Sequence, residues 1–142
     1  MENYKSAMYQ QDVMDEFSRQ ASVSFYGPGF KGFDPNLNIE KVIKKIGGAD
    51  ILIVGHSWLT DTPGSQVDPY PNLYLESCPI PKVMILNKEY ANLEAKLNWI
   101  SEKNFSYGFS HYQDVDFLEK KTKVFFKFIP FAFNENLFKK IS

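Results

Sequence analysis

The chain has 142 residues, which is enough for one domain with a single core and too short for two α/β lobes. Its 16 basic residues nearly balance its 17 acidic residues, and the net charge of -1 excludes a general attraction to nucleic acid or to an acidic membrane surface. Arg19 is the only arginine, so bidentate recognition of phosphate or guanine is hardly available.

The first predicted elements are a helix and a strand. Apolar residues spaced three, four and seven apart predict an amphipathic helix over residues 4–20. Val23 and Phe25 alternate with smaller or polar residues, which predicts a strand over residues 22–26. This strand stops at Gly27-Pro28-Gly29, a run of strong turn residues. The turn is expected to shape one wall of a cleft at the carboxyl end of the strand.

A second helix and a central strand follow. Asn38 is the expected N-cap of a helix over residues 39–46, and Gly47-Gly48 can adopt the left-handed conformation that ends a helix. Residues 51–54 form a continuous apolar run before Gly55, as expected for a parallel strand covered on both faces. We therefore expect this strand in the middle of a sheet.

Residues 59–81 lack any periodicity and contain several prolines, so a long regular element is not expected there. A loop of this length in a compact domain is either functional or mobile. Three carboxylates in the loop, Asp61, Asp68 and Glu76, lack metal-ligand spacing. They are interpreted as solvated side chains, and neither a metal site nor a cofactor is predicted.

The rest of the chain alternates between strands and helices. Strands are predicted over residues 82–86, 105–110 and 123–128, with one helix capped by Asn87 and another over residues 115–121. This alternation favours right-handed crossovers and an α/β fold. We expect one Rossmann-like domain over residues 1–142, with a doubly wound, mostly parallel sheet of about five strands flanked by helices.

Ligands of such sheets bind beyond the carboxyl ends of the strands, and both histidines of the chain fall at predicted strand ends. His56 is the preferred candidate for a general base, and His111 is the weaker one. Ser57 can orient a hydroxyl group, and Trp58 offers a flat face of the kind that stacks on a sugar ring. The alternative is that each histidine only hydrogen-bonds a neighbouring loop.

Other sites and locations find little support in the sequence. The Gly27-Pro28-Gly29 turn lacks the third glycine and the following helix of a dinucleotide-binding loop, and no common hydrolase or Walker motif is present. Cys78, the only cysteine, has no disulfide partner within the chain and no metal spacing. No stretch approaches the roughly 20 apolar residues that cross a bilayer. These features predict a cytoplasmic protein without a membrane span.

A family resemblance rests on the order of several short motifs. They are the strand ending in Tyr26-Gly27-Pro28-Gly29-Phe30, the strand of residues 49–54, the entry Ile80-Pro81-Lys82-Val83 and the closing segment of residues 130–134 with Phe138. In this order and spacing, roughly from Ser22 to Phe138, the chain resembles the amino-terminal half of two-lobed GT-B glycosyltransferases. The spore-maturation-type, family-4-like group is the variety that it resembles most.

The resemblance implies a role in binding the acceptor, because the carboxyl-terminal lobe of that family binds the nucleotide-sugar donor. It implies acceptor-side roles for Tyr26, Gly27, Gly29, His56, Ser57 and His111. Two departures matter: the family's first strand, normally before the opening helix, is missing, and so is the donor lobe. Asn134 also stands where the family often has an aspartate. The chain is therefore expected to be a truncated or split part of a glycosyltransferase, inactive without a separate donor-binding lobe.

Two alternatives belong to other functional classes. One is a flavodoxin-like or receiver-like binding module that has no catalytic activity. The other is an interaction domain that pairs with a second copy of itself through an exposed edge of the sheet, because unpaired edges favour association. A sugar or glycan acceptor, a donor-binding lobe and a second copy are thus the partners considered.

Overall fold

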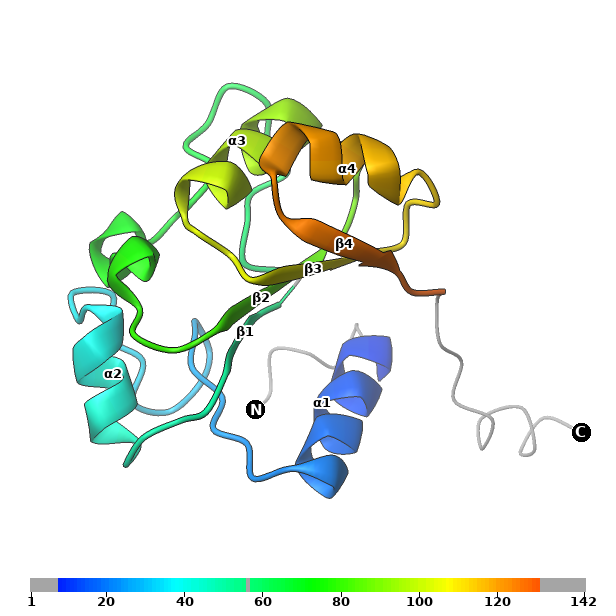
Figure 1. Ribbon diagram of the computed structural model, residues 1–142. Coiled ribbons are helices and arrows are strands. Elements are labelled where there is room, and N and C mark those ends of the chain that lie inside the picture. Colours follow the sequence, from blue (N-terminus) through cyan, green and yellow to red (C-terminus); the bar gives the residue numbers. More distant parts are fainter. Residues whose placement is uncertain (1–7, 56, 131–142) are drawn as a thin grey trace, which may run out of the picture. The chain divides into compact units, whose positions relative to one another are not determined.

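The computed structural model describes residues 8–55 and 57–130 (Figure 1). The chain divides into two compact units, of which one is Met1–Asp34 with Phe131–Ser142 and the other is Pro35–Pro130. Each unit is described by itself. The single domain predicted over residues 1–142 stays a prediction.

The first unit contains α1 (Met8–Gln20), which confirms the described part of the predicted opening helix. The predicted strand over residues 22–26 is wrong, because none of these residues pairs with a described strand. The segment packs locally instead: Phe25 stacks on Phe30, with ring centroids 5.5 Å apart. Gly29 lies in the turn between them with φ +87°, a conformation that favours glycine. Local aromatic packing thus replaces cross-strand pairing.

The second unit opens with α2 (Ile39–Lys45), which confirms the predicted helix and its cap. The side chain of Asn38 accepts a hydrogen bond from the Lys41 backbone N–H, at 3.0 Å. At the other end, Gly47 and Gly48 have φ values of +87° and +106°. The Gly48 N–H binds a carbonyl of the last turn at 2.9 Å, so the glycine pair ends the helix as expected.

Four parallel strands form the sheet, in the order β1 (Leu52–Val54), β2 (Lys82–Leu86), β3 (Tyr107–Ser110) and β4 (Phe125–Phe128). Helices α3 (Leu93–Glu102) and α4 (Val115–Thr122) follow β2 and β3. Figure 1 shows both helices on the same side of the sheet. Right-handed crossovers produce this arrangement when successive strands are added in one direction.

The α/β class and the parallel, Rossmann-like sheet flanked by helices are therefore confirmed. The sheet has four described strands rather than about five. Among them β1 lies at one end of the order, so the prediction of this strand in the middle of the sheet is wrong for the described strands. Its strand order runs in one direction, so these strands do not include the reversal of order that defines a doubly wound sheet. A sequential order is also what one half of a doubly wound sheet shows, because the order reverses only at its centre.

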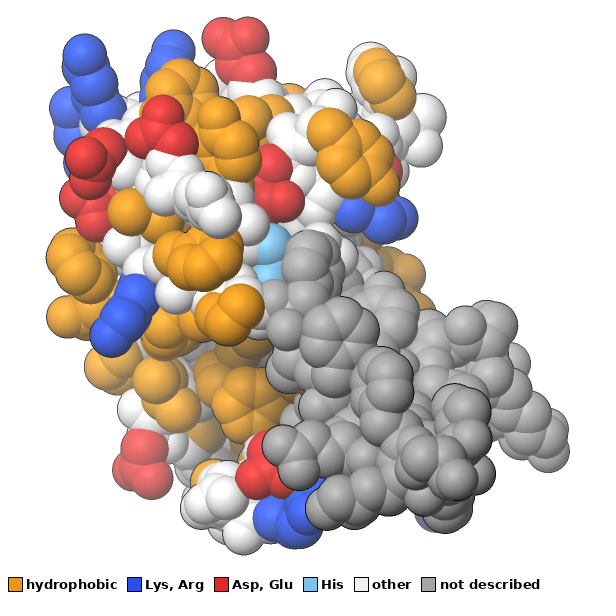
Figure 2. All heavy atoms as spheres, turned by 90° about the vertical axis from the view of Figure 1, so that its right-hand side faces the viewer, with side chains coloured by type: hydrophobic (Ala, Val, Ile, Leu, Met, Phe, Trp, Pro, Cys, Tyr) orange, Lys and Arg blue, Asp and Glu red, His pale blue; other side chains and the backbone are white. Residues whose placement is uncertain are grey.

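The two faces of the sheet differ in burial. On the face toward α3 and α4, Gly108 pairs in register with Phe126, and a Cβ atom at Gly108 would overlap the buried Phe126 ring. On the opposite face, Tyr107 and Phe125 are 49% and 54% exposed, and their rings meet edge-on at 5.3 Å. Figure 2 shows hydrophobic side chains, in orange, at the surface of the described part of the chain. The second face is thus apolar and only partly covered.

The helix predicted to begin after Asn87 begins later, at Leu93. Residues between them form a loop in which Lys88 and Asn92 both adopt the left-handed conformation, with φ of 52° and 54°. The Ala91 N–H closes a turn on the Lys88 carbonyl at 2.9 Å. Asn87 is therefore not the N-cap, and the chain extends the carboxyl end of β2 before α3 starts.

Candidate functional site at the carboxyl edge of the sheet

Three consecutive strands carry polar residues just beyond their carboxyl ends. Ser57 follows β1, Glu89 follows β2 and His111 follows β3. Because neighbouring strands lie about 4.8 Å apart, the ends of β1 and β3 are separated by about 10 Å. That span suits a small ligand. We refer to these three residues and their hydrogen-bond partners as the edge site.

Glu89 is held by β3. The Ser110 hydroxyl donates a hydrogen bond to Oε1 of Glu89, and the His111 backbone N–H donates to the same oxygen at 3.2 Å. Ser110 is fully buried, and its oxygen also accepts the Tyr112 backbone N–H at 3.0 Å. The buried hydroxyl therefore has both a donor and an acceptor partner, and it fixes one oxygen of the Glu89 carboxylate.

His111 lies at the edge, as predicted, and its ring is oriented by the backbone. Nδ1 lies 2.8 Å from the carbonyl oxygen of Ile129, the residue that follows β4. Since a carbonyl oxygen can only accept a hydrogen bond, Nδ1 carries the proton and the neutral ring has its lone pair on Nε2. This tautomer allows Nε2 to accept a proton, as a general base requires.

The other site residues predicted after β1 differ in their positions and contacts. His56, the preferred general base, lies outside the described residues. Ser57 is exposed at the edge. The indole N–H of Trp58 donates to Oδ1 of Asp68 at 3.2 Å, and its ring packs on Tyr70 with centroids 5.2 Å apart. These contacts hold Trp58 within its own loop, so its ring supports the loop whether or not it contacts a ligand.

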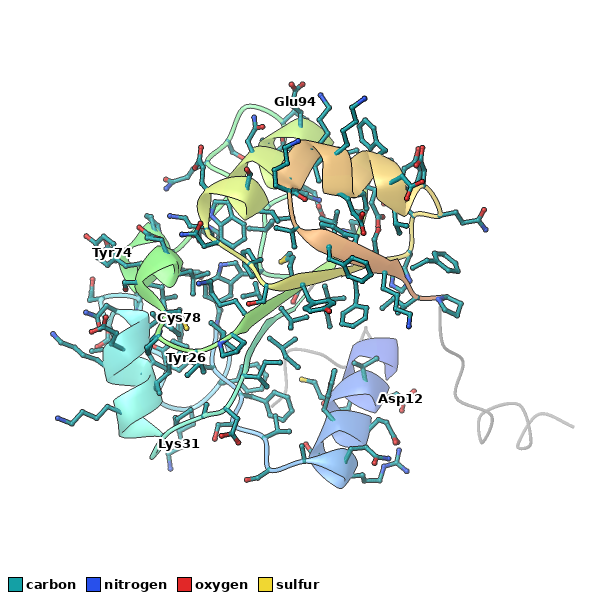
Figure 3. The ribbon with its side chains drawn as sticks, in the orientation of Figure 1. Asp12, Tyr26, Lys31, Tyr74, Cys78 and Glu94 are labelled. Carbon is teal, nitrogen blue, oxygen red and sulfur yellow. The ribbon has the colours of Figure 1, made fainter. Side chains whose placement is uncertain are left out.

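Tyr26, Gly27 and Gly29 belong to the first unit, whereas the edge site belongs to the second. Tyr26, labelled in Figure 3, has a local role. Its hydroxyl donates to the Asp34 carbonyl at 2.7 Å and accepts the Asp34 N–H at 3.1 Å. This contact closes the turn that contains both glycines. The substrate-binding roles predicted for the three residues stay predictions.

The interpretation of the three carboxylates of the long loop as solvated side chains is wrong. Each of them binds α3 or its C-cap. The pairs are Asp61 with Lys96 at 2.6 Å, Asp68 with the Trp99 indole at 3.1 Å, and Glu76 with Lys103 at 2.7 Å. The three partners are spaced three and four apart, which places them along one face of the helix. The loop between β1 and β2 is thereby pinned along the helix.

Asp68 is the most buried of the three carboxylates, at 4% exposed. Its two oxygens accept the indole N–H groups of Trp58 and Trp99, and Oδ1 also accepts the Tyr70 backbone N–H at 2.9 Å. The loop supplies two of these three donors and α3 supplies the third. Asp68 therefore joins the loop after β1 to α3 through buried, charge-assisted hydrogen bonds.

Asp61 lies between two lysines. Lys96, only 2% exposed, also donates to the carbonyls of Asn87 and Lys88 at 3.2 and 3.3 Å, and the Lys88 ammonium binds Asp61 at 2.8 Å. Burial raises the pKa of Asp61, but hydrogen bonds from Lys88 and Lys96 outweigh it and hold the pKa below its ordinary value of 3.8. This cluster fixes the loop after β2 against the loop after β1.

Glu76 and Lys103 form the third contact, nearer the protein surface. The hydrogen bond from Lys103 outweighs partial burial and lowers the pKa of Glu76 below its ordinary value of 4.5. No group of three histidine, cysteine or carboxylate side chains in the described parts of the chain could hold a metal ion. None of the described helices is long and apolar enough to cross a membrane.

Sequence reasoning identified the strand ends but missed the residues that organise them. Glu89 lies three residues beyond β2, and only its position after the strand could have marked it. Lys96 was part of the predicted helix, and its burial between two carbonyls depends on where that helix begins. The loop carboxylates find their partners only when α3 packs against the loop, and no local sequence pattern predicts that packing.

Comparisons of the chain with protein-family models, with curated proteins and with solved structures gave no match. Its function is therefore argued from the fold and from the edge site.

Proposed function

We propose that this chain binds the acceptor for a glycosyltransferase of the two-lobed, GT-B type, similar to the spore-maturation-type, family-4-like group. The sequential parallel strands support the proposal, because one half of a doubly wound lobe has this order. The observation that carries it is His111 at the carboxyl end of β3, with its Nδ1–H donated to Ile129. That contact orients the His111 ring at the edge where such sheets bind ligands, and in the neutral ring it places the lone pair on Nε2.

In this proposal His111 takes the proton of an acceptor hydroxyl, and Ser57 hydrogen-bonds the same ligand from the end of β1. Trp58, fixed by Asp68, forms a wall of the site. His56, the base that the sequence favours, stays a prediction. The nucleotide-sugar donor would be bound by another lobe, so transfer of a sugar requires that lobe as well.

The test compares two classes of ligand on the same protein. Isothermal titration with nucleotide sugars is expected to show no binding to this chain. Saturation-transfer NMR with neutral methyl glycosides is expected to show binding that weakens when His111 is replaced by alanine. Binding of nucleotide sugars together with no response to glycosides would reject an acceptor-side function.

A second candidate function, a domain that associates with a second copy of itself, is favoured by the partly covered sheet face. Tyr107 and Phe125 on this face are about half exposed, and large exposed apolar patches often mark interfaces. Light scattering of the purified chain would show a dimer that Tyr107→Ser with Phe125→Ser converts to a monomer. A monomeric wild-type chain at all concentrations would reject this candidate.

A further inference from the structure

We infer that Glu89 binds a hydroxyl group of a neutral, polyhydroxylated ligand at the edge site, beside His111. The inference rests on the proposed acceptor-binding function and adds the residue and the ligand chemistry. Glu89 was not among the predicted site residues. It follows β2, between the strand ends that carry Ser57 and His111.

The two oxygens of Glu89 have different environments. Oε1 accepts both the Ser110 hydroxyl and the His111 backbone N–H. Oε2 has no hydrogen-bond partner among the residues that the structure describes. Glu89 is half-buried, so its carboxylate is partly accessible from solvent. One oxygen is thus fixed by the protein, and the other is left to accept a hydrogen bond.

The rigidity of this arrangement comes from Ser110. Its hydroxyl is fully buried and is oriented by the Tyr112 N–H, which leaves its proton directed to Glu89. A carboxylate held in this way loses little further side-chain freedom when a ligand binds. Ser110 is therefore a positioning residue, and Glu89 is the residue that touches the ligand.

The chemistry of the ligand follows from the charges at the edge. A carboxylate can only accept hydrogen bonds, and it repels a phosphate or another anion. Lys88 and Lys96 do not reverse this preference, because their two positive charges are offset by Asp61, which binds both of them, and by Glu89 itself. Neutral hydroxyl groups, by contrast, can donate to Oε2 of Glu89. The edge site thus favours an uncharged sugar over a nucleotide.

The test uses the Glu89→Gln variant, which keeps an oxygen for Ser110 and His111 but replaces Oε2 with a donating amide. Affinities for a panel of neutral methyl glycosides are measured by saturation-transfer NMR titration. We expect the variant to bind at least about tenfold more weakly than the wild type, because a charge-assisted hydrogen bond is lost. Glu94→Gln removes the same charge from the exposed first turn of α3, where Figure 3 labels Glu94, and is expected to leave the affinity unchanged.

Ser110→Ala provides a second variant if circular dichroism shows that Glu89→Gln does not fold. It leaves the carboxylate but removes the hydroxyl that orients it, and we expect glycoside binding about three- to tenfold weaker. The orienting role also predicts that Ser110→Thr, which retains a hydroxyl, recovers part of the affinity.

The outcomes separate the inference from the function on which it rests. If the wild type binds glycosides and Glu89→Gln, or in its place Ser110→Ala, binds them equally well, the role of Glu89 is rejected while the acceptor-binding function stands. If the wild type binds none of the glycosides, both are rejected. Loss of binding in Glu89→Gln but not in Glu94→Gln supports both.

Discussion

The loop after β1 and the loop after β2 both lie at the carboxyl edge of the sheet, but the carboxylates of the two loops differ in their hydrogen-bond partners. In the long loop, Asp61, Asp68 and Glu76 each bind α3 or its C-cap. In the short loop, the described residues bind only Oε1 of Glu89. A long, proline-rich segment is therefore fixed along α3 here. In the proposed function, the short loop presents an acceptor to ligands.

Asp61 and Asp68 have hydrogen-bond partners on both carboxylate oxygens, whereas Glu89 has partners on one among the described residues. Under the proposed function, this difference rather than loop length separates these two structural carboxylates from the one that binds a ligand. A buried carboxylate with partners on both oxygens has little capacity left for a ligand. A half-buried carboxylate fixed through one oxygen combines orientation with an available acceptor. The predictions below test each side of this contrast.

The largest expected effect is that of Asp68→Ala. The substitution leaves the indole N–H groups of Trp58 and Trp99 without their acceptor, and each buried unsatisfied donor costs about 1–3 kcal/mol. We expect the free energy of unfolding in urea to fall by about 2–5 kcal/mol. Asp50→Ala, at an exposed position, is the matched control and should change it by less than about 0.5 kcal/mol. Similar changes in the free energy of unfolding for the two variants would contradict the claim that Asp68 fixes the long loop to α3.

Lys96→Met should have the next largest effect. It removes a buried ammonium and leaves the carbonyls of Asn87 and Lys88 without this donor, which we expect to cost about 1–3 kcal/mol. Lys88→Met removes the other cation bound to Asp61, but its side chain is 49% exposed, so a loss below about 1 kcal/mol is expected. Denaturant unfolding of both variants compares them directly. An equal loss would mean that burial of Lys96 does not stabilise the loops.

Acid should weaken the contacts of the long loop. The pKa values of Asp61 and Glu76 are lowered on folding, so their contribution is present above their ordinary values of 3.8 and 4.5 and is lost as the pH falls through the folded-state values. The double variant Asp61→Asn, Glu76→Gln should lose up to about 1 kcal/mol at pH 7 and less at pH 3. Thermal unfolding of the wild type and the double variant across this pH range checks whether the difference in stability decreases toward pH 3. A constant difference would show that the ionised carboxylates do not stabilise the fold.

The smallest expected effect is that of Ser57→Ala on ligand binding. Ser57 is exposed, and its hydroxyl is expected to add one neutral hydrogen bond to the ligand. Glycoside affinity should therefore fall only about two- to fivefold, with unchanged stability. Ser65→Ala, which alters a hydroxyl farther along the same loop, is the control. A loss as large as that of Glu89→Gln would shift the centre of the site toward β1.

Much of the fold was predictable because its signals are local. The cap at Asn38, the glycine pair after α2 and the apolar runs of the strands each indicate an element within a few residues. The alternation of apolar residues over residues 22–26 predicted a strand that does not form. Alternation within one segment does not show whether a neighbouring strand is available to pair with it. The register of β3 places Ser110 and His111 against Glu89, a contact 21 or 22 residues apart in sequence that no local pattern contains.

The most direct test of the edge site is a titration of the isotope-labelled chain with a neutral methyl glycoside, followed by backbone amide chemical shifts. The His111 N–H donates to Glu89, so its resonance should report any hydroxyl that binds this carboxylate. We expect the largest shifts at Ser57, Glu89 and His111. Shifts confined to other parts of the chain, such as the face that carries Tyr107 and Phe125, would contradict a ligand site at the carboxyl edge of the sheet.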